Sequence, residues 1–472
     1  MKPAITDIRM EDMFTDNPYH LLSKPSPNLR GLTALVIGMG ESGVAATNLL
    51  LREGAQVWAY DINPQKETQL RQIWEPRGVR VLTGTLQPMV GIDFAVVSPG
   101  VPPFGPIFTW LAQAEIPLLG EMELACRFLS RPIIAATGTN GKTTTVNMIH
   151  HILKSCGYES DLAGNVGYPV AQLATEKDRQ GHQPIVLEVS SYQCETFEEF
   201  KADIALITNL APDHLERYNS IHHYYETKFQ IAINQTPNEA LLMGPMVEGD
   251  CPNWVESRRL SFGIQDTGLQ GVFYSEHTLI IRDGSKEERH SCPSFDQLPT
   301  QQVLNTLAAV AATTIFRVPL DEALAAMENF LPLPHRLEYV GSVQGIRCYN
   351  DSKATNVHAL EAALRSLPAP IRLIAGGRSK GDSLDPVADL IREKVSGIYL
   401  IGEAREEFAR AWGSLTSVQT FSTLEEAVHQ GLRDGSVGEI LLLSPACASW
   451  DMFSSYKERG DRFREAVKEY VK

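Results

Sequence analysis

Short apolar runs alternate with stretches of helical periodicity over most of the chain. Near the start of this pattern, apolar runs at 34–37, 57–60 and 94–98 flank or follow a helical stretch at 42–53. Short buried strands that alternate with helices are typical of a mostly parallel sheet covered by helices. The pattern therefore predicts an α/β unit over residues 31–120.

The same alternation continues in a second and a third region. Further strands are expected at 133–136, 185–189, 205–209, 271–273, 278–281, 371–375, 398–401 and 440–443, and helices at 302–316 and 320–330. The segment Pro332–Leu333–Pro334 ends the second helix, because proline cannot donate the next backbone hydrogen bond. We predict an arm over residues 1–30, then three α/β domains: a Rossmann-like domain at 31–120, a central domain with a mostly parallel sheet at 121–333, and a Rossmann-like domain at 334–472.

Composition narrows the class of protein. Hydrophobic residues make up 43% and charged residues 21%, which disfavours a disordered, coiled-coil or collagen-like chain. The net charge of −15 repels nucleic acid and anionic membranes, and no run of about 18 apolar residues occurs. The seven cysteines are scattered without a C-x-x-C pair, which indicates reduced thiols and no structural zinc. We therefore expect a cytoplasmic protein that holds anionic ligands with locally placed cations.

A loop of small and polar residues with one lysine follows the strand predicted at 133–136. Its residues are Gly138, Thr139, Asn140, Gly141, Lys142, Thr143, Thr144 and Thr145. Between a strand and a helix, backbone N–H groups and the helix N-terminus can hold phosphates. Lys142 would neutralise the β and γ phosphates, and Thr143 would offer its hydroxyl to Mg²⁺. The strict P-loop pattern has Gly where this chain has Ala136, so the loop is a variant, and a plain glycine turn is the alternative.

A second glycine-rich turn follows the first predicted strand. Gly38, Gly40 and Gly43 open the first helix, and Asp61 ends the next strand. This spacing matches a dinucleotide-binding fingerprint. The same glycines would also hold another phosphate-bearing nucleotide, or simply let a helix pack closely on a strand. The residues alone leave these three readings open.

Two polar side chains follow neighbouring strands of the central domain. Glu188 ends an otherwise apolar strand, where a carboxylate costs desolvation energy unless it meets a cation. A Mg²⁺ ion near the P-loop would supply that cation, and a buried salt bridge is the alternative. His214 follows the next strand, and parallel strands open on one edge of a sheet. Glu188 and His214 can therefore share a site.

The third region carries polar loops after three of its strands. Arg336 precedes the first of them and suits phosphate oxygens, which its planar fork can bind in pairs. Asp351 and Lys353 follow a strand and precede a helix, where they could contact nucleotide and substrate. The segments 376–381 and 444–449 also follow strands, and each alone could be a simple turn.

Together these motifs resemble the Mur ligases, the ATP-dependent amide-bond ligases that build the stem peptide of peptidoglycan. The segments T-G-T-N-G-K-T, E-V-S-S-Y-Q, D-H-L-E-R-Y, H-R-L-E, N-D-S-K-A-T-N and S-P-A-C-A-S-W-D occur in this order. The resemblance covers about residues 30–472. Within the family, S-S-Y-Q, N-D-S-K-A-T-N, G-G-R-S-K-G and S-P-A-C-A-S resemble the branch that adds D-glutamate to UDP-N-acetylmuramoyl-L-alanine. The D-N-P-R segment of the branch that adds a diamino acid is absent.

The resemblance implies an acyl-phosphate mechanism that releases ADP and phosphate, with ATP and two Mg²⁺ ions. The catalytic residues that it implies are Lys142, His214, Lys228 and Lys353. It places the UDP-substrate on Gly40, Glu41, Ser42, Asp61, Ser98, Pro99, Gly100 and Asn165. This placement favours a uridine nucleotide over a nicotinamide cofactor in the first domain.

The resemblance also assigns the remaining ligands. ATP would be held by the residues of the P-loop together with Asn305, Arg336 and Asp351. D-glutamate would be held by Thr355, Lys380 and Ser449. The metal ligands would be Thr143, Glu188, His214 and Lys228, the last as a carbamate formed with CO₂. Gln302 stands where the family commonly has Asn, so its role toward ATP is open. The expected partners are these small-molecule substrates, with no nucleic acid or membrane, and the expected state is a monomer.

Overall fold

The computed structural model describes residues 27–85, 89–102, 104–176, 180–213, 217–331, 333–379 and 381–470. Most of the arm predicted at 1–30 therefore lies outside the described residues. The chain forms two compact units. The first holds the described residues up to Leu210, with His214–Pro293 and Leu304–Asn329, and the second holds Ala211–Asp213, Ser294–Val303 and Phe330–Lys472.

Five of the described strands form the first sheet of the first unit, and all are parallel. Their order is β3-β2-β1-β4-β5, with bounds β1 (Thr33–Ile37), β2 (Gln56–Asp61), β3 (Arg80–Thr83), β4 (Phe94–Val97) and β5 (Leu118–Gly120). The helices are α1 (Glu41–Arg52), α2 (Glu67–Trp74) and α3 (Pro106–Gln113), with short 3₁₀ turns η2 (Pro64–Lys66) and η3 (Glu75–Arg77). This parallel sheet with helices confirms the Rossmann-like prediction. The sequence could predict it because strands that are buried on both faces are continuous apolar runs.

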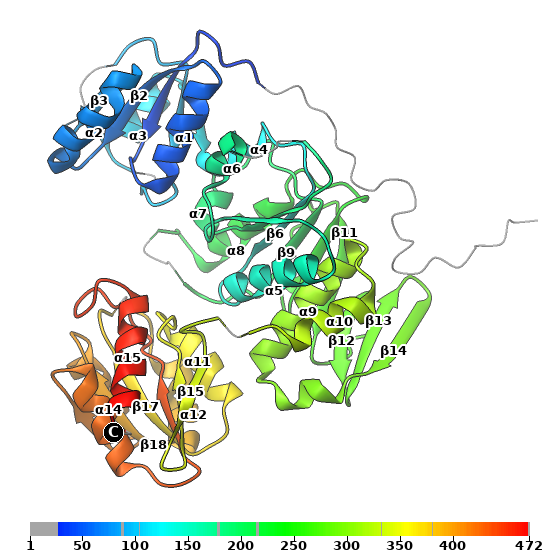
Figure 1. The fold of residues 1–472 in the computed structure, drawn as a ribbon, viewed down its shortest axis with the longest axis vertical. Helices are drawn as coiled ribbons and strands as arrows, with labels where there is room; N and C mark the ends of the chain where they lie inside the picture. The colour runs from blue at the N-terminus through cyan, green and yellow to red at the C-terminus, as the bar shows by residue number, and fades with distance from the viewer. Residues whose placement is uncertain are drawn as a thin grey trace, which may run out of the picture. The chain divides into compact units, whose positions relative to one another are not determined.

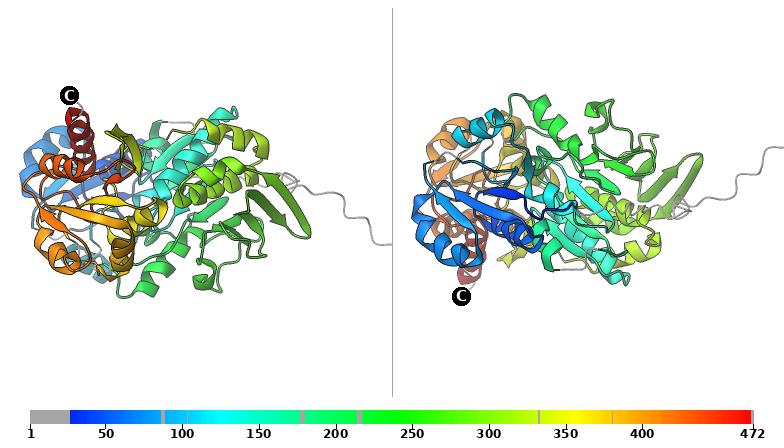
Figure 2. Two further views of the ribbon diagram at one scale, coloured as in Figure 1. Left: turned by 90° about the horizontal axis from the view of Figure 1, so that it is seen from below. Right: turned by 90° about the horizontal axis from the view of Figure 1, so that it is seen from above.

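Nine of the described strands form the second sheet. Their order is β14-β13-β12-β11-β10-β9-β6-β8-β7, with bounds β6 (Ile133–Thr137), β7 (Asp161–Gly164), β8 (Ile185–Glu188), β9 (Ile204–Ile207), β10 (Ala240–Met243), β11 (Arg258–Gly263), β12 (Gly271–Ser275), β13 (Thr278–Asp283) and β14 (Lys286–Ser291). Strands β6 to β12 are parallel, and the β13–β14 hairpin adds two antiparallel strands at one edge (Figures 1 and 2). The predicted mostly parallel sheet is confirmed. The sequence pattern missed β14 because its residues are almost all polar, as an edge strand tolerates.

Helices accompany this second sheet. They are α4 (Glu121–Cys126), α5 (Lys142–Ser155), α6 (Val170–Glu176), α7 (Ser191–Cys194), α8 (Ile221–Phe229), α9 (Thr300–Ile315) and α10 (Leu320–Glu328), with the 3₁₀ turns η4 (Gln230–Ala232), η5 (Glu248–Asp250) and η6 (Pro293–Gln297). The helices α5, α9 and α10 lie side by side (Figure 1). Helix α5 follows β6 after the loop at 138–141, as predicted for a P-loop unit.

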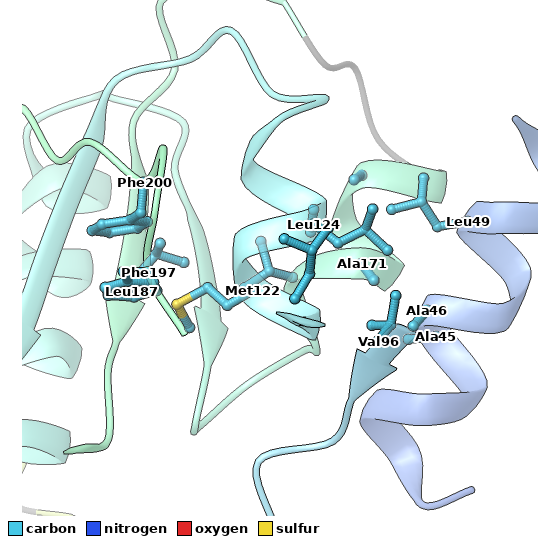
Figure 3. Close-up of a cluster of buried hydrophobic side chains, with 14 of the residues drawn as sticks. Ala45, Ala46, Leu49, Val96, Met122, Leu124, Ala171, Leu187, Phe197 and Phe200 are labelled. Atoms are coloured by element: carbon cyan, nitrogen blue, oxygen red, sulfur yellow. The ribbon is translucent and has the colours of Figure 1, made fainter. Parts of the chain in front are cut away.

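One hydrophobic core joins the two sheets of the first unit. Figure 3 shows Leu49 of α1, Leu124 of α4 and Ala171 of α6 facing one another, with Met122 reaching toward Leu187 of the second sheet. All of these side chains are at most 2% exposed. The predicted domain boundary between residues 120 and 121 therefore stays a prediction, because the apolar core is continuous across it.

The second unit contains a sheet of six described strands. Their order is β15-β16-β20-β17-β18-β19, with bounds β15 (Glu338–Val343), β16 (Ile346–Asn350), β17 (Ile371–Gly376), β18 (Val395–Ile401), β19 (Val418–Thr420) and β20 (Ile440–Leu443). The helices are α11 (Val357–Ser366), α12 (Ala388–Lys394), α13 (Arg405–Trp412), α14 (Leu424–Asp434) and α15 (Tyr456–Tyr470), with the turn η7 (Asp385–Val387). Only β15 is antiparallel to its neighbour in this sheet of described strands. Leu373 packs in one apolar cluster and Ile374 in another, so both sheet faces are covered.

Candidate active site

The strand ends of the second sheet bring several of the predicted ATP and metal residues to one edge. Ala136 of β6 lies opposite Glu188 of β8, which in turn lies opposite Gly164 of β7. On the other side of β6, Thr137 lies opposite Ile207 of β9. The P-loop, Asn165 and Glu188 therefore meet where ligands bind in parallel sheets.

Two glycines give the P-loop its shape. Gly138 has a φ of +138°, and a Cβ atom on it would lie 2.0 Å from Thr208 Oγ1. Gly141 has a φ of +84° and caps the N-terminus of α5. Side chains at these positions would strain the backbone or collide with β9, so the loop conformation depends on glycine.

Asn209 holds the first half of this loop. Its backbone carbonyl accepts the N–H of Thr139 at 3.0 Å, and its Oδ1 accepts the N–H of Asn140 at 2.9 Å. The first intrahelical bond of α5 runs from the Thr145 N–H to the Gly141 carbonyl. The N–H groups of the first turn of α5 have no intrahelical acceptors, so their geometry is suited to an anion. The sequence did not reveal this role of Asn209.

Two lysines converge on one carbonyl of the loop. Lys142 Nζ donates to the carbonyls of Gly138 at 2.7 Å and Thr139 at 2.9 Å. Lys228 is 1% exposed, and its Nζ donates to the same Gly138 carbonyl at 3.0 Å. The Lys228 amine also lies 4.5 Å from the ring centroid of Tyr224, whose hydroxyl is 3.4 Å from Thr139 Oγ1. The two lysines, each predicted to be catalytic, therefore meet at the Gly138 carbonyl of the P-loop.

Glu188 is a buried carboxylate with one satisfied oxygen. It is 2% exposed, and its Oε1 accepts a hydrogen bond from Asn165 Nδ2 at 2.7 Å. Its Oε2 has no hydrogen-bond partner among the described residues. A buried carboxylate oxygen left without a donor fits a cation ligand. Within the described ranges, no group of three or more His, Cys, Asp or Glu side chains is arranged to hold a metal, and the predicted ligand His214 lies outside them.

Thr145 and Asn305 also meet in this region. Thr145 Oγ1 donates to Asn305 Oδ1 at 3.4 Å, and both residues are buried. Asn305 lies on α9, next to α5, so the predicted ATP residue is beside the P-loop helix. Thr143 and Thr144 occupy the first turn of α5 and are half-buried.

The glycines of the first sheet have different roles. Gly38 has a φ of +88°, and its carbonyl accepts the Ser98 hydroxyl at 2.7 Å. A Cβ atom on Gly43 would lie 1.9 Å from the Gly38 oxygen, so Gly43 serves the close packing of helix on strand. A Cβ atom on Gly40 would meet nothing within 4 Å. Packing explains Gly43, while the surface at Gly40 leaves room for a ligand.

Asp61 fastens this glycine turn. Its Oδ2 accepts the Met39 N–H at 3.1 Å and the Lys66 ammonium at 2.8 Å, and its Oδ1 accepts the Asn63 N–H. Burial alone would raise the pKa of Asp61, but these hydrogen bonds and the Lys66 charge outweigh it and lower the pKa. The carboxylate therefore orders the turn through the Met39 backbone.

Three of the other UDP-substrate candidates line two hollows of the first unit. Ser98 and Pro99 line a cavity of about 40 Å³ together with Gln193. Glu41 lines a wider groove of about 880 Å³ between α1 and the segment that follows Asn165. Ser42 is in the first turn of α1, Gly100 follows β4, and Asn165 is exposed apart from its bond to Glu188.

In the second unit, Arg336 lies in a strained turn. Its neighbours His335 and Leu337 have φ angles of +65° and +47°. The Leu337 N–H donates to Asp351 Oδ1 at 3.1 Å, and the Ser444 hydroxyl donates to Asp351 Oδ2 at 3.0 Å. Burial raises the pKa of Asp351 to about 7, against the opposing effect of these hydrogen bonds. Asp351 thus ties the Arg336 turn to the end of β20.

The predicted D-glutamate residues belong to loops of the same unit. The Lys353 N–H bonds to the His335 carbonyl at 3.0 Å, and its Nζ lies 4.2 Å from the Tyr456 ring centroid. Thr355 is half-buried in the same loop, and Ser449 is 3% exposed after β20. Lys380 lies outside the described residues.

Arg459 joins these loops, although no sequence motif singled it out. It is 1% exposed, and it donates to the Ser352 hydroxyl at 3.0 Å, to the Ser352 carbonyl at 2.8 Å and to the Cys447 carbonyl at 3.1 Å. Burial lowers its pKa to about 10. One guanidinium therefore ties the loop before Lys353 to the loop before Ser449.

Arg459→Met is expected to destabilise the protein by about 2–4 kcal/mol, because it leaves buried carbonyls without their donor. The measurement is urea-induced unfolding followed by a probe in the second unit. Arg462→Met is the matched control, since Arg462 is on the same helix in a half-exposed ion pair with Glu425, and its loss should cost below about 1 kcal/mol. Equal destabilisation by both variants would contradict this role of Arg459.

Comparison with known proteins places the chain in a family. The model of the MurD-like N-terminal domain of Mur ligases matches residues 33–120, the Mur ligase middle domain matches 136–313, and the Mur ligase glutamate ligase domain matches 335–447. Among solved structures, the MurF ligase of Thermotoga maritima in complex with ADP has a TM-score of 0.56 at 17% identity, with 94% of this chain and 96% of that chain covered. The UDP-N-acetylmuramate-alanine ligase MurC of the same organism has a TM-score of 0.53 at 18% identity, over 93% and 99% of the two chains. These structures share the fold.

Two relatives are closer in sequence. Proteins of Geobacter metallireducens and Koribacter versatilis, both named UDP-N-acetylmuramoylalanine–D-glutamate ligase, are 36% and 37% identical to this chain. Each alignment covers 93% of this chain and 98% of the relative. The matches span the first sheet, the P-loop edge and the loops of the second unit. The chain therefore belongs to the Mur ligases, within the branch of the UDP-N-acetylmuramoylalanine–D-glutamate ligases.

Proposed function

We propose that this chain joins D-glutamate to UDP-N-acetylmuramoyl-L-alanine with the hydrolysis of ATP to ADP and phosphate, a step of peptidoglycan precursor synthesis. The observation that carries the proposal is the sheet edge where the P-loop, Lys142, Lys228 and the half-satisfied Glu188 gather. Such an edge can position a nucleotide triphosphate and a cation beside an acyl group. The family branch supplies the identity of the amino acid.

The chemistry explains why ATP is needed. A carboxylate does not react with an amine near pH 7, because oxide would have to leave. Transfer of the γ-phosphoryl group to the alanyl carboxylate gives an acyl phosphate, and the D-glutamate amine then displaces phosphate and forms the amide. Lys142 and Arg336 would stabilise the charge on the transferring phosphoryl group, because such reactions depend on positioning and electrostatics.

The residues present fit the expected Mg²⁺ ions. Glu188 would be a ligand through its unpaired Oε2, Thr143 through its hydroxyl, and His214 through its ring. When bound, Mg²⁺ would neutralise phosphate charge during transfer. Lys228 is proposed to act as a carbamate, an anion that could join this ligand set. Carbamylation requires the neutral amine, the form that burial favours for a lysine, and Lys228 is buried.

The substrates would occupy separate parts of the chain. The UDP-substrate would lie on the glycine turn of the first sheet, with Gly40, Glu41, Ser42, Asp61, Ser98, Pro99, Gly100 and Asn165. Lys353, Thr355, Lys380 and Ser449 of the second unit would hold D-glutamate. The protein carries a net charge of −15, so an amino acid with two carboxylates needs local cations of this kind.

Asp61→Ala is expected to raise the KM for the UDP-substrate about 10-fold with a smaller change in kcat, because the Met39 N–H loses its acceptor and the glycine turn loosens. Steady-state kinetics with varied UDP-substrate measure the effect. Asp93→Ala is the matched control: Asp93 accepts the Thr33 N–H at the opposite end of β1, and its loss should leave this KM unchanged. Specific micromolar binding of NAD by the wild type would overturn the uridine assignment.

The direct test of function is a phosphate-release assay with ATP, Mg²⁺ and UDP-N-acetylmuramoyl-L-alanine across a panel of amino acids. We expect release with D-glutamate and none above background with L-glutamate, L-alanine or L-lysine. Release that follows another amino acid would identify a sister ligase of the same fold instead.

Localisation in the cytoplasm and a monomeric state are part of the proposal. No helix among the described residues has the length and apolar character needed to cross a membrane.

A further inference from the structure

An exposed ion pair lies beside the loop of Ser449. Arg378 Nε and Nη2 donate to the two carboxylate oxygens of Glu403, each at 3.0 Å. The Arg378 side chain is 51% exposed and that of Glu403 is 58% exposed. This is the parallel, two-bond geometry in which a guanidinium recognises a carboxylate. The Glu403 carboxylate is therefore bound by the exposed guanidinium of Arg378.

The backbone fixes Arg378 next to Ser449. The Arg378 N–H donates to the Ala448 carbonyl at 2.9 Å, and the Ala448 N–H donates to the Arg378 carbonyl at 3.1 Å. A Cβ atom on Gly377 would lie 2.4 Å from the same Ala448 oxygen, so only glycine permits this approach. On the other side, the Glu403 N–H donates to Asp451 Oδ2 at 2.9 Å. The Arg378 backbone is thus held beside Ala448, the residue before Ser449, which is one of the proposed D-glutamate residues.

The pair is suited to exchange. An exposed ion pair contributes little net stability, because water solvates both partners well when they separate. Another carboxylate that offers the same two oxygens could therefore replace Glu403 at small cost. The side chain of glutamate carries the same group at the same distance from its Cα as Glu403 does.

We propose that Arg378 binds the side-chain carboxylate of the incoming D-glutamate and that Glu403 occupies the guanidinium until the amino acid arrives. The inference rests on the proposed function and names an additional residue for its amino-acid site. The reacting amine is on the α-carbon, so the α-carboxylate must stay near the reaction centre. The side-chain carboxylate is the end that can extend to an exposed residue such as Arg378.

Three variants test the exchange. Arg378→Gln should raise the KM for D-glutamate about 10- to 100-fold, the usual effect of losing a charge-assisted pair of hydrogen bonds, and leave the KM values for ATP and UDP-substrate unchanged. Glu403→Gln removes the competing carboxylate and should lower the KM for D-glutamate up to about 5-fold. Arg365→Gln is the matched control, since it breaks the Arg365–Glu361 pair in the last turn of α11 of the same unit and should change neither constant.

A merely structural ion pair gives a different result. If the pair only holds the loop, Arg378→Gln and Glu403→Gln raise the KM together, which would overturn the proposal. A second readout is the preference for D-glutamate over D-glutamine in kcat/KM, which should fall in Arg378→Gln by at least about 10-fold. An unchanged preference would also overturn it. If the wild type turns over D-glutamate and Arg378→Gln has wild-type kinetics, this inference is wrong but the proposed function stands. If the wild type is inactive with D-glutamate, the proposed function is wrong.

Discussion

Lys142→Ala is expected to lower kcat for ATP-dependent phosphate release by about 10²- to 10³-fold, the typical effect of removing one well-placed charge from a reacting group. The Lys142 amine donates hydrogen bonds to the Gly138 and Thr139 carbonyls, at the N-terminus of α5 where phosphates are expected. Binding of the UDP-substrate should stay nearly intact, because its proposed residues lie mostly on the first sheet. Stopped assays of phosphate and titration calorimetry with the UDP-substrate measure the two effects separately.

Lys154→Ala provides the control for this prediction. Lys154 is exposed in the last turn of α5, so the variant removes the same side chain from the same helix far from the loop. It should retain wild-type kcat. If Lys142→Ala weakened ATP turnover and UDP-substrate binding equally, the assignment of the two ligands to different sheets would be wrong.

Lys228→Arg is expected to lose most activity, about 10²-fold in kcat, although it keeps a positive charge. An arginine cannot form the carbamate, and its guanidinium repels the cation that the carbamate would hold. Depletion of bicarbonate should lower the activity of the wild type reversibly. This second measurement is independent of packing, which matters because Lys228 is 1% exposed and arginine is the larger side chain.

Lys201→Arg is the matched control for this substitution. Lys201 is a partly exposed lysine of the same unit, paired with Glu239, and either basic side chain can serve there. The variant should keep full activity. A fully active Lys228→Arg enzyme, or wild-type activity that does not respond to bicarbonate, would refute the carbamate.

Most strands that the sequence predicted are apolar on both faces, but the pattern missed the buried apolar strand β10 as well as the polar strand β14. The runs at β1, β6 and β20 are buried throughout or nearly so, and their pattern identifies them without tertiary information. Strand β14 is polar and lies at an edge, so nothing in its residues separates it from a loop. The P-loop was predictable because its glycines, lysine and flanking elements occur together.

The site residues that the sequence missed act through the backbone of distant segments. Asn209 orders the P-loop by binding two of its N–H groups, and Arg459 ties two loops together through their carbonyls. Each of these residues is far along the chain from the groups that it binds, so no local sequence motif indicates the contact. Asp61 stays a predicted nucleotide ligand, and the structure adds that its oxygens accept hydrogen bonds from the Met39 and Asn63 N–H groups and from Lys66.

The core shared by α1, α4 and α6 limits how this chain can be recombined with its relatives. The end of the first sheet at Gly120 is followed at once by α4, whose Met122 and Leu124 are buried between the two sheets (Figure 3). A chimaera joined at that point would pair an apolar face from one parent with an unrelated face from the other. Mismatched faces leave voids or overlaps, and these cost stability in a close-packed interior. A chimaera that exchanges the domain of the first sheet should therefore take α1, α4 and α6 from one parent.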